Sequence, residues 1–158
     1  MIHHPFNPVQ RYLLASILAL ACVQAHAQEP NADIYGKWKI KALIGGGAIS
    51  SRSQSQVEKV IGQFTTISRE QFDFDNHRCT HPDYQRHQEE TASYFDAGWR
   101  ADVSDIPLPN PVTIIETGCT TFLYPIRKDH LMIADDGDFF EAVRVTSSPR
   151  KATRPVHR

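Results

Sequence analysis

Cysteine and histidine side chains stand closest to recognisable chemistry in this sequence. His77, Cys79 and His81 alternate along the chain, and Cys119 follows further on. Alternate residues of an extended strand point the same way, so the first three could hold a metal ion, although a fourth ligand with a recognisable spacing is missing. Residues 1–27 have the features of an export signal, and a pair of cysteines in an exported protein is most simply one disulfide. The sequence therefore predicts a Cys79–Cys119 disulfide, with a metal site as the alternative.

Catalytic motifs are missing from the sequence. Serine is plentiful, but the G-x-S-x-G nucleophile motif does not occur. The glycine run 45–47 lacks the Lys-Ser/Thr ending of a phosphate-binding loop. Asp135, Asp136 and Asp138 crowd around a glycine and could attract calcium, but an EF-hand spacing is absent and a hairpin turn is expected instead. We predict a protein that is not an enzyme and that uses no cofactor and no metal.

One stretch, residues 84–100, concentrates aromatic and arginine side chains, which are the types enriched at binding hot spots. A helix there would bring Phe95 and Trp99 together at positions i and i+4. The candidate binding residues are Tyr84, Arg86, Tyr94, Phe95, Trp99 and Arg100. Binding would require at least two of the rings to be exposed or to line a mouth of the fold. The alternative is that the rings only cap an open end of the fold.

Alternation of apolar and polar residues predicts most of the chain as short strands. Residues 35–44 alternate aromatic or apolar side chains with Lys37, Lys39 and Lys41, which is typical of a strand with one wet face. Asp136-Gly137 supplies the positive-φ residues of a tight hairpin turn. Further strands are expected at 64–68, 71–75, 84–90, 112–117, 121–124, 131–134 and 139–145.

Helical periodicity is confined to two short segments, residues 55–61 and 90–99. Three prolines within residues 105–111 exclude both a helix and a central strand there. Short strands at roughly ten-residue spacing, without any β-α-β alternation, indicate a mainly β protein. The expected fold is an antiparallel up-and-down barrel of about eight strands with one or two short helices.

Gly36-Lys37-Trp38 opens the first predicted strand, and Arg144 belongs to the last one. This arrangement resembles the Gly-x-Trp at the start of the lipocalin fold, in which the Trp closes one end of an eight-stranded barrel and an Arg lies across its ring. The resemblance implies a structural barrel base formed by Gly36, Trp38 and Arg144, and an apolar interior. The family's Thr-Asp-Tyr motif has no counterpart, since Thr120-Thr121-Phe122 matches only its first residue.

The first 27 residues have the order of a secretory signal peptide. Arg11 precedes an apolar run over residues 12–23, and Ala25-His26-Ala27 forms a small-x-small cleavage site. The run is too short to cross a bilayer, which needs about 20 residues. Cleavage near Ala27 would make the protein periplasmic or secreted, and Cys22 leaves a lipid anchor open as an alternative.

Charge gives little reason to expect a polyanionic partner. The chain carries 17 Lys and Arg against 18 Asp and Glu, a net charge of −1, so no global argument favours nucleic acid or an anionic membrane. Residues 149–158 are basic and contain two prolines, which is typical of a disordered tail. The expected organisation is a signal peptide at 1–27, a single β-barrel domain at 28–148 and a basic tail at 149–158.

Two functions are compatible with these features. The first is a periplasmic lipocalin-like protein that binds a small apolar or amphipathic ligand, because an eight-stranded barrel is about the smallest that can enclose one. The alternative is a periplasmic protein-interaction module, such as an inhibitor or immunity protein for a cell-wall enzyme or toxin. Residues 28–148 carry 12 Lys and Arg against 18 Asp and Glu, and an acidic body of this kind would suit a basic target protein.

Overall fold

A computed structural model describes residues 29–146, so the predicted signal peptide, Cys22 and the basic tail lie outside the described residues. The described part is mainly β and contains nine strands and two helices. The helices are α2 (Gln54–Val60) and α3 (Thr91–Trp99). The strands are β1 (Gly36–Gly46), β2 (Phe64–Ile67), β3 (Gln71–Phe74), β4 (His77–Thr80), β5 (Gln85–Glu89), β6 (Val112–Glu116), β7 (Phe122–Arg127), β8 (His130–Asp135) and β9 (Asp138–Arg144).

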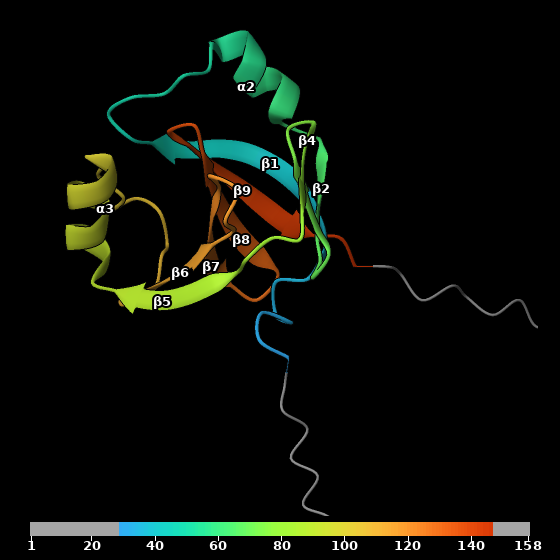
Figure 1. Ribbon diagram of the computed structural model, residues 1–158. Helices are drawn as coiled ribbons and strands as arrows, with labels where there is room; N and C mark the ends of the chain where they lie inside the picture. The colour runs from blue at the N-terminus through green and yellow to red at the C-terminus, as the bar shows by residue number, and fades with distance from the viewer. Residues whose placement is uncertain (1–28, 147–158) are drawn as a thin grey trace, which may run out of the picture. The chain divides into compact units, whose positions relative to one another are not determined.

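All nine strands form one antiparallel sheet in the order β4-β3-β2-β1-β9-β8-β7-β6-β5. Strands that are neighbours in the sequence pair with each other, except β4 and β5, and the first and last strands pair as well, which is an up-and-down order. β4 and β5 are both edges of the sheet, so the barrel predicted from the sequence is a curled half-barrel. Figure 1 shows this curl, with β1 and β5 on opposite sides of the interior.

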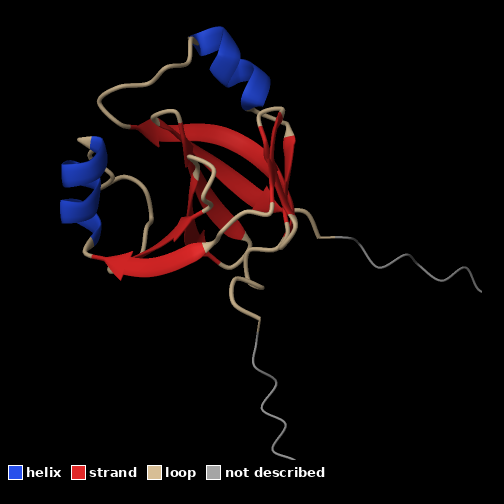
Figure 2. Ribbon diagram, in the orientation of Figure 1, coloured by secondary structure: helices blue, strands red, loops and turns tan. Residues whose placement is uncertain are grey.

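Two irregularities bend the long first strand. The register with β9 shifts between Ile40 and Ala42 and again between Leu43 and Gly45. Each such bulge adds a residue on one strand and increases the local bend and twist. The bulges let β1 follow the curl of the sheet, which Figure 2 shows as a red arc below α2.

Alternating side chains divide the core into two clusters on opposite faces of the sheet. In β8, Leu131 and Ile133 belong to the first cluster, and Met132 and Ala134 belong to the second. The first cluster joins residues from β1 to β3 with residues from β6 to β9, so it fills the concave interior. The second lies on the other face of β6 to β9, where α3 and residues 100–111 cover it.

Most predicted elements lie where the sequence pattern placed them. β4 is the strand that the pattern did not predict, because His77, Arg78 and Thr80 are exposed and polar and give no apolar alternation. β7 runs on through Pro125 to Arg127, beyond its expected end, with a register shift after the proline. Neither helix of the described residues is long and apolar enough to span a bilayer.

Candidate functional site

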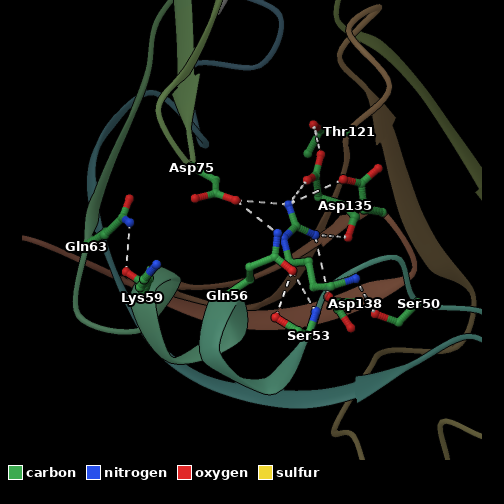
Figure 3. Close-up of polar contacts among 11 residues, drawn as sticks. Ser50, Ser53, Gln56, Lys59, Gln63, Asp75, Thr121, Asp135 and Asp138 are labelled. Atoms are coloured by element: carbon green, nitrogen blue, oxygen red, sulfur yellow. Dashed lines mark hydrogen bonds and ion pairs between the residues drawn. The ribbon is translucent and has the colours of Figure 1, made fainter.

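Arg52 lies between β1 and α2, and its guanidinium enters a group of aspartates at one end of the half-barrel. Its side chain is only 6% exposed. Nη2 donates to the carboxylate of Asp135 and lies 3.2 Å from Oδ2 of Asp75. Nη1 donates to the main-chain oxygen of Asp135 at 2.7 Å and lies 3.5 Å from Oδ2 of Asp138. Figure 3 shows Asp75, Asp135 and Asp138 converging on this one guanidinium.

These contacts join three separate parts of the chain: the loop that carries Arg52, the turn after β3 that carries Asp75, and the β8–β9 hairpin. In the hairpin, Asp135 ends β8 and Asp138 begins β9. Thr121 adds a fourth segment, because its hydroxyl donates to Oδ1 of Asp135 at 2.7 Å. Arg52 therefore fastens the turn after β3 to the β8–β9 hairpin at the open end of the curl.

The β8–β9 turn is built to receive the Arg52 segment closely. The amide of Ser51 donates to the main-chain oxygen of Asp136 at 3.1 Å. Gly137 has φ 86°, and a Cβ atom there would collide with the main-chain oxygen of Ile49. Glycine is required here both by its positive φ and by the close approach of the two backbones. Just beyond Arg52, the amide of Ser53 donates to Oε1 of Gln56 at 2.8 Å and fixes the start of α2.

The cluster carries more negative than positive charge. Asp136 is the fourth carboxylate, with Oδ2 3.7 Å from Nη2 of Arg52, so one guanidinium faces four aspartates. Burial alone would lower the pKa of Arg52, but the hydrogen bonds and charges of Asp135, Asp75 and Asp136 outweigh burial and raise it. Oδ2 of Asp138 is buried and accepts no hydrogen bond within residues 29–146. The cluster keeps Arg52 charged and has carboxylate charge in excess.

A cleft of about 350 Å³ opens beside this cluster. Phe72 and Phe74 from the concave face of β3 line its inner end; the two rings are stacked with centroids 6.4 Å apart, and the residues are only 2% and 4% exposed. Asp135 and Asp136 lie along its acidic side. The cleft has the size of a small-molecule site and combines two largely buried aromatic residues at its inner end with a few charged groups.

The opposite side of the cleft is formed by β4 and the disulfide. Cys79 of β4 is bonded to Cys119 of the β6–β7 turn, with Cα atoms 6.2 Å apart. His77 and Arg78 are exposed residues beside it, and Nε of Arg78 donates to Asp73 at 2.9 Å. The predicted disulfide is confirmed, and it ties a free edge of the sheet to the strands across the curl.

The disulfide also decides between the two interpretations of the His77, Cys79 and His81 pattern. The sulfur of Cys79 is bonded to carbon and sulfur and is not a free thiolate. Nδ1 of His81 lies 3.4 Å from the carboxylate of Glu70, away from the cleft that His77 lines. Among residues 29–146 no group of histidine, cysteine and acidic side chains has the arrangement of a metal site.

Gly36, Trp38 and Arg144 come together at the far end of β1 from the cleft. Trp38 is 2% exposed, and its Nε1 donates to the main-chain oxygen of Ile34 at 2.9 Å. The guanidinium carbon of Arg144 lies 4.1 Å from the centroid of the Trp38 ring. Gly36 has φ 141°, and a Cβ atom there would lie 2.7 Å from Nη1 of Arg144. The geometry is that of a closed base under the half-barrel.

The aromatic residues of the 84–100 segment do not form one surface. Phe95 is fully buried among Tyr124 and Phe139, so its ring cannot meet a partner. Trp99 packs edge-on against Phe122 and Phe139 with centroids 5.6 and 5.3 Å away. These contacts place the rings of α3 over the second core cluster, on the outer face of the sheet. The alternative prediction, that these rings cap an open end of the barrel, is therefore wrong, because the rings lie on the outer face of the sheet.

Tyr94 joins the same packing through a polar contact. Its hydroxyl lies 3.1 Å from that of Tyr124, which is buried. Burial, together with the hydrogen bond to Tyr94, raises the pKa of Tyr124 above its usual range. Tyr124 is accordingly a neutral member of the core, and the half-buried Tyr94 packs against it.

The remaining candidates of the segment lie elsewhere. Tyr84 packs against the first cluster, and its hydroxyl donates to the main-chain oxygen of Ser68 at 3.0 Å. Arg86 donates to Asp33 at 2.7 Å. Arg100 is exposed at the end of α3 and lines an open hollow of about 490 Å³ against residues 101–110. The six candidates are thus divided among four places.

Arg52, Asp75 and Thr121 are site residues that the sequence reasoning missed. Arg52 belongs to a serine- and glutamine-rich loop with no periodic pattern, and its partner Asp135 is 83 residues away. The crowding of Asp135, Asp136 and Asp138 was the one available signal. It predicted the hairpin turn without indicating the arginine that the carboxylates hold.

Comparison of the chain with protein-family models, with curated proteins and with solved structures finds no match.

Proposed function

We propose that this protein is an exported, periplasmic binding protein that takes a small amphipathic molecule into the cleft beside Arg52. The observation that carries the proposal is the composition of the cleft. Its inner end is lined by Phe72 and Phe74, which are 2% and 4% exposed, and its side by the carboxylates of Asp135 and Asp136. An apolar part of a ligand would reach the small exposed part of the two rings, and a polar part would meet the rim.

The position of the cleft in the curl supports the same function. Arg144 and Asp138 stand at opposite ends of β9, so the base and the Arg52 cluster are about 20 Å apart along the strand. A half-barrel closed by Trp38 at one end and open at the other is similar to a lipocalin, and small ligands commonly bind in the mouths of β-barrels. The proposed ligand enters at the mouth.

The filled interior limits how deep the ligand can lie. The concave face is packed with large side chains, among them Phe140, Leu131 and Ile133, which are all fully buried. Close-packed side chains leave no room for a second molecule without rearrangement. The ligand of this proposal is therefore held at the mouth, in contact with solvent on one side.

The rigid surroundings of the cleft favour a preformed site. Arg52 fastens the turn after β3 to the β8–β9 hairpin, and the Cys79–Cys119 disulfide fastens β4 to the β6–β7 turn. Holding both walls in place before binding reduces the ordering cost of association. Through the first of these links, Arg52 is a positioning residue of the proposed site.

The test uses N-phenyl-1-naphthylamine, an apolar fluorescent probe, with the mature chain. We expect its fluorescence to rise on binding, and His77→Trp, which fills the cleft from an exposed strand position, to weaken binding at least tenfold. His87→Trp is the matched control, because His87 is an exposed histidine of β5 outside the cleft. Equal binding by both variants, or none by the unchanged protein, would contradict the proposal.

Native mass spectrometry of the protein purified from its own periplasm then addresses the natural ligand. A small-molecule adduct that is lost in His77→Trp and kept in His87→Trp supports the proposal. A stoichiometric protein adduct that persists in both variants supports the alternative, a protein-interaction module.

A further inference from the structure

The outer face of β1 and β2 carries a cationic and apolar surface that the cleft does not use. Lys37, Lys39 and Lys41 are all exposed along β1. Phe64 of β2 is 52% exposed, and Val145, just after β9, is 40% exposed. We call these five residues the lysine face.

Strand register brings the members of the lysine face together. Lys39 stands opposite Phe64, and the amide of Val145 donates to the main-chain oxygen of Lys37 at 2.8 Å. The Nζ atoms of Lys37 and Lys39 lie 4.3 and 5.8 Å from the centroid of the Phe64 ring. Two ammonium groups thus gather around one exposed aromatic ring.

The charge of this face is opposite to that of the Arg52 cluster. Acidic residues adjoin this face on both sides. Glu141 of β9 stands opposite Ala42 and holds His130 at 2.8 Å. Asp73 of β3 stands opposite Thr66 and accepts from Arg78 at 2.9 Å. Both carboxylates thus have partners of their own, and three lysines act together on a chain whose net charge is −1. A local field of this kind attracts an anionic partner even though the whole chain does not.

We propose that the lysine face docks the protein on an anionic phospholipid bilayer. Lysines interleaved with an aromatic and an aliphatic side chain suit the lipid interface, where ammonium groups reach the headgroups and the apolar groups enter the acyl boundary. A protein partner is less well matched, because lysine is depleted at protein interfaces whereas arginine, tyrosine and tryptophan are enriched. The lysine face holds none of those three types.

Sedimentation with vesicles tests the docking surface. The mature chain is mixed with vesicles of phosphatidylglycerol and phosphatidylcholine in equal amounts, and with vesicles of phosphatidylcholine alone. We expect binding only to the anionic vesicles and a fall of at least tenfold when the salt rises from about 0.05 to 0.5 M, because salt screens the attraction. Absence of binding to the anionic vesicles overturns the proposal.

Variants of the lysine face give the second measurement. The double variant Lys37→Glu and Lys39→Glu should lose at least tenfold in vesicle binding. Its control, Arg100→Glu with Ala97→Glu and Gly98→Glu, changes the net charge equally at exposed sites in α3 and at its end. Equal loss in both variants overturns the proposal, because binding would then follow net charge alone.

Three single variants test the exposed aromatic ring of Phe64. Phe64→Ser should weaken vesicle binding severalfold, Phe64→Leu should restore it, and Ile49→Ser should leave it unchanged, since Ile49 is an exposed apolar residue elsewhere. Circular dichroism verifies that each variant is folded. If Ile49→Ser lowers binding as much as Phe64→Ser, the lysine face is not the contact.

Two further measurements distinguish vesicle binding by the lysine face from binding by the basic tail and from binding of nucleic acid. Replacing the four cations of residues 149–158 by serine tests the tail, and loss of all vesicle binding in that variant alone overturns the proposal. Binding to a single-stranded oligonucleotide with no binding to vesicles overturns it in favour of nucleic acid.

Discussion

The central carbon of the Arg144 guanidinium lies 4.1 Å from the centroid of the Trp38 ring. The same guanidinium donates to the main-chain oxygens of Tyr35 and Asp33 and lies 3.0 Å from the carboxylate of Asp129. One side chain of the last strand thus holds the first strand, the segment that leads into it and the β7–β8 turn. This convergence explains how a sheet with two free edges keeps one end closed.

Truncation of Trp38 tests this base. Trp38→Ala should lower the free energy of unfolding by about 3–5 kcal/mol, because it leaves a cavity under Arg144. A double-mutant cycle with Arg144→Ala should give a coupling of about 0.5–2 kcal/mol for the cation–π pair. Urea denaturation measures all four proteins. Additive effects would show that the two side chains stabilise the fold independently.

Removal of the disulfide tests the link across the open side of the curl. The bond between Cys79 and Cys119 closes a loop with a sequence separation of 40 residues. In the chain-entropy description such a loop stabilises the fold by about 4 kcal/mol. Cys79→Ser with Cys119→Ser should lose that amount, and peptide mapping of the unchanged protein without reduction should find the two cysteines linked. Two free thiols in the map would contradict the bond.

The alternation of apolar and polar residues was sufficient to predict the strands that bury one face. The alternation of lysines with Trp38 and Ile40 predicted β1 correctly, because each apolar side chain enters the interior that the strand helps to enclose. β4 could not be predicted in this way. It is held by pairing with β3 and by the disulfide of Cys79, which are long-range constraints without a local period.

Substitution of Arg52 tests whether the cluster at the mouth links the turn after β3 to the β8–β9 hairpin. Arg52→Met should lower the free energy of unfolding by about 3–5 kcal/mol, because it leaves buried carboxylates without their cation. Arg52→Lys keeps the charge but loses the forked hydrogen bonding, so a smaller loss is expected. Arg78→Met is the control, since its ion pair with Asp73 is exposed, and it should cost less than about 1 kcal/mol. A fully stable Arg52→Met protein would remove Arg52 from its positioning role.

The start of α3 has a pH dependence of definite sign. Glu90 caps the helix by accepting hydrogen bonds from Ser93 and Ala92, at 2.8 Å and 3.2 Å. The bond with Ser93 is the main cause of the lowered pKa of Glu90. A lowered pKa in the folded state means that the stabilisation is complete above the ordinary value of 4.5 and is lost as the pH falls through the folded value.

Comparison of the unchanged protein with Glu90→Ala measures this contribution. The variant should be the less stable protein at neutral pH, and the difference should shrink as the pH falls below 4.5 and the carboxylate becomes protonated. Glu89→Ala, at an exposed neighbour in β5, controls for the change in net charge. A difference between Glu90→Ala and the unchanged protein that stays constant over this range would show that the carboxylate does not act as the cap.

The candidate site was less predictable than the fold for a physical reason. Tyr84, Phe95 and Trp99 have the composition of a binding surface, yet aromatic side chains also give the largest gain on burial in a core. Composition cannot separate these two uses. The Arg52 cluster depends on side chains brought together from four segments, and charged residues in a loop give no period from which to infer their partners.

Trp99 separates a core role from a binding role within the 84–100 segment. Its ring contacts Phe139 and Phe122 on the outer face of the sheet, and it does not line the cleft beside Arg52. Trp99→Ala should therefore lower the free energy of unfolding by about 3 kcal/mol, near the lower end for such truncations because the ring is only partly buried. Asp96→Ala, at an exposed position of the same helix, should change stability little.

The same variants are then titrated with N-phenyl-1-naphthylamine under conditions in which all are folded. Trp99→Ala should bind the probe as the unchanged protein does, because the second core cluster lies on the face of the sheet opposite to the first cluster, to which Phe72 and Phe74 of the cleft belong. Loss of probe binding with an unchanged unfolding midpoint would instead assign α3 to the binding surface. Loss of stability with unchanged binding would establish Trp99 as the residue that anchors α3 to the outer face of the sheet.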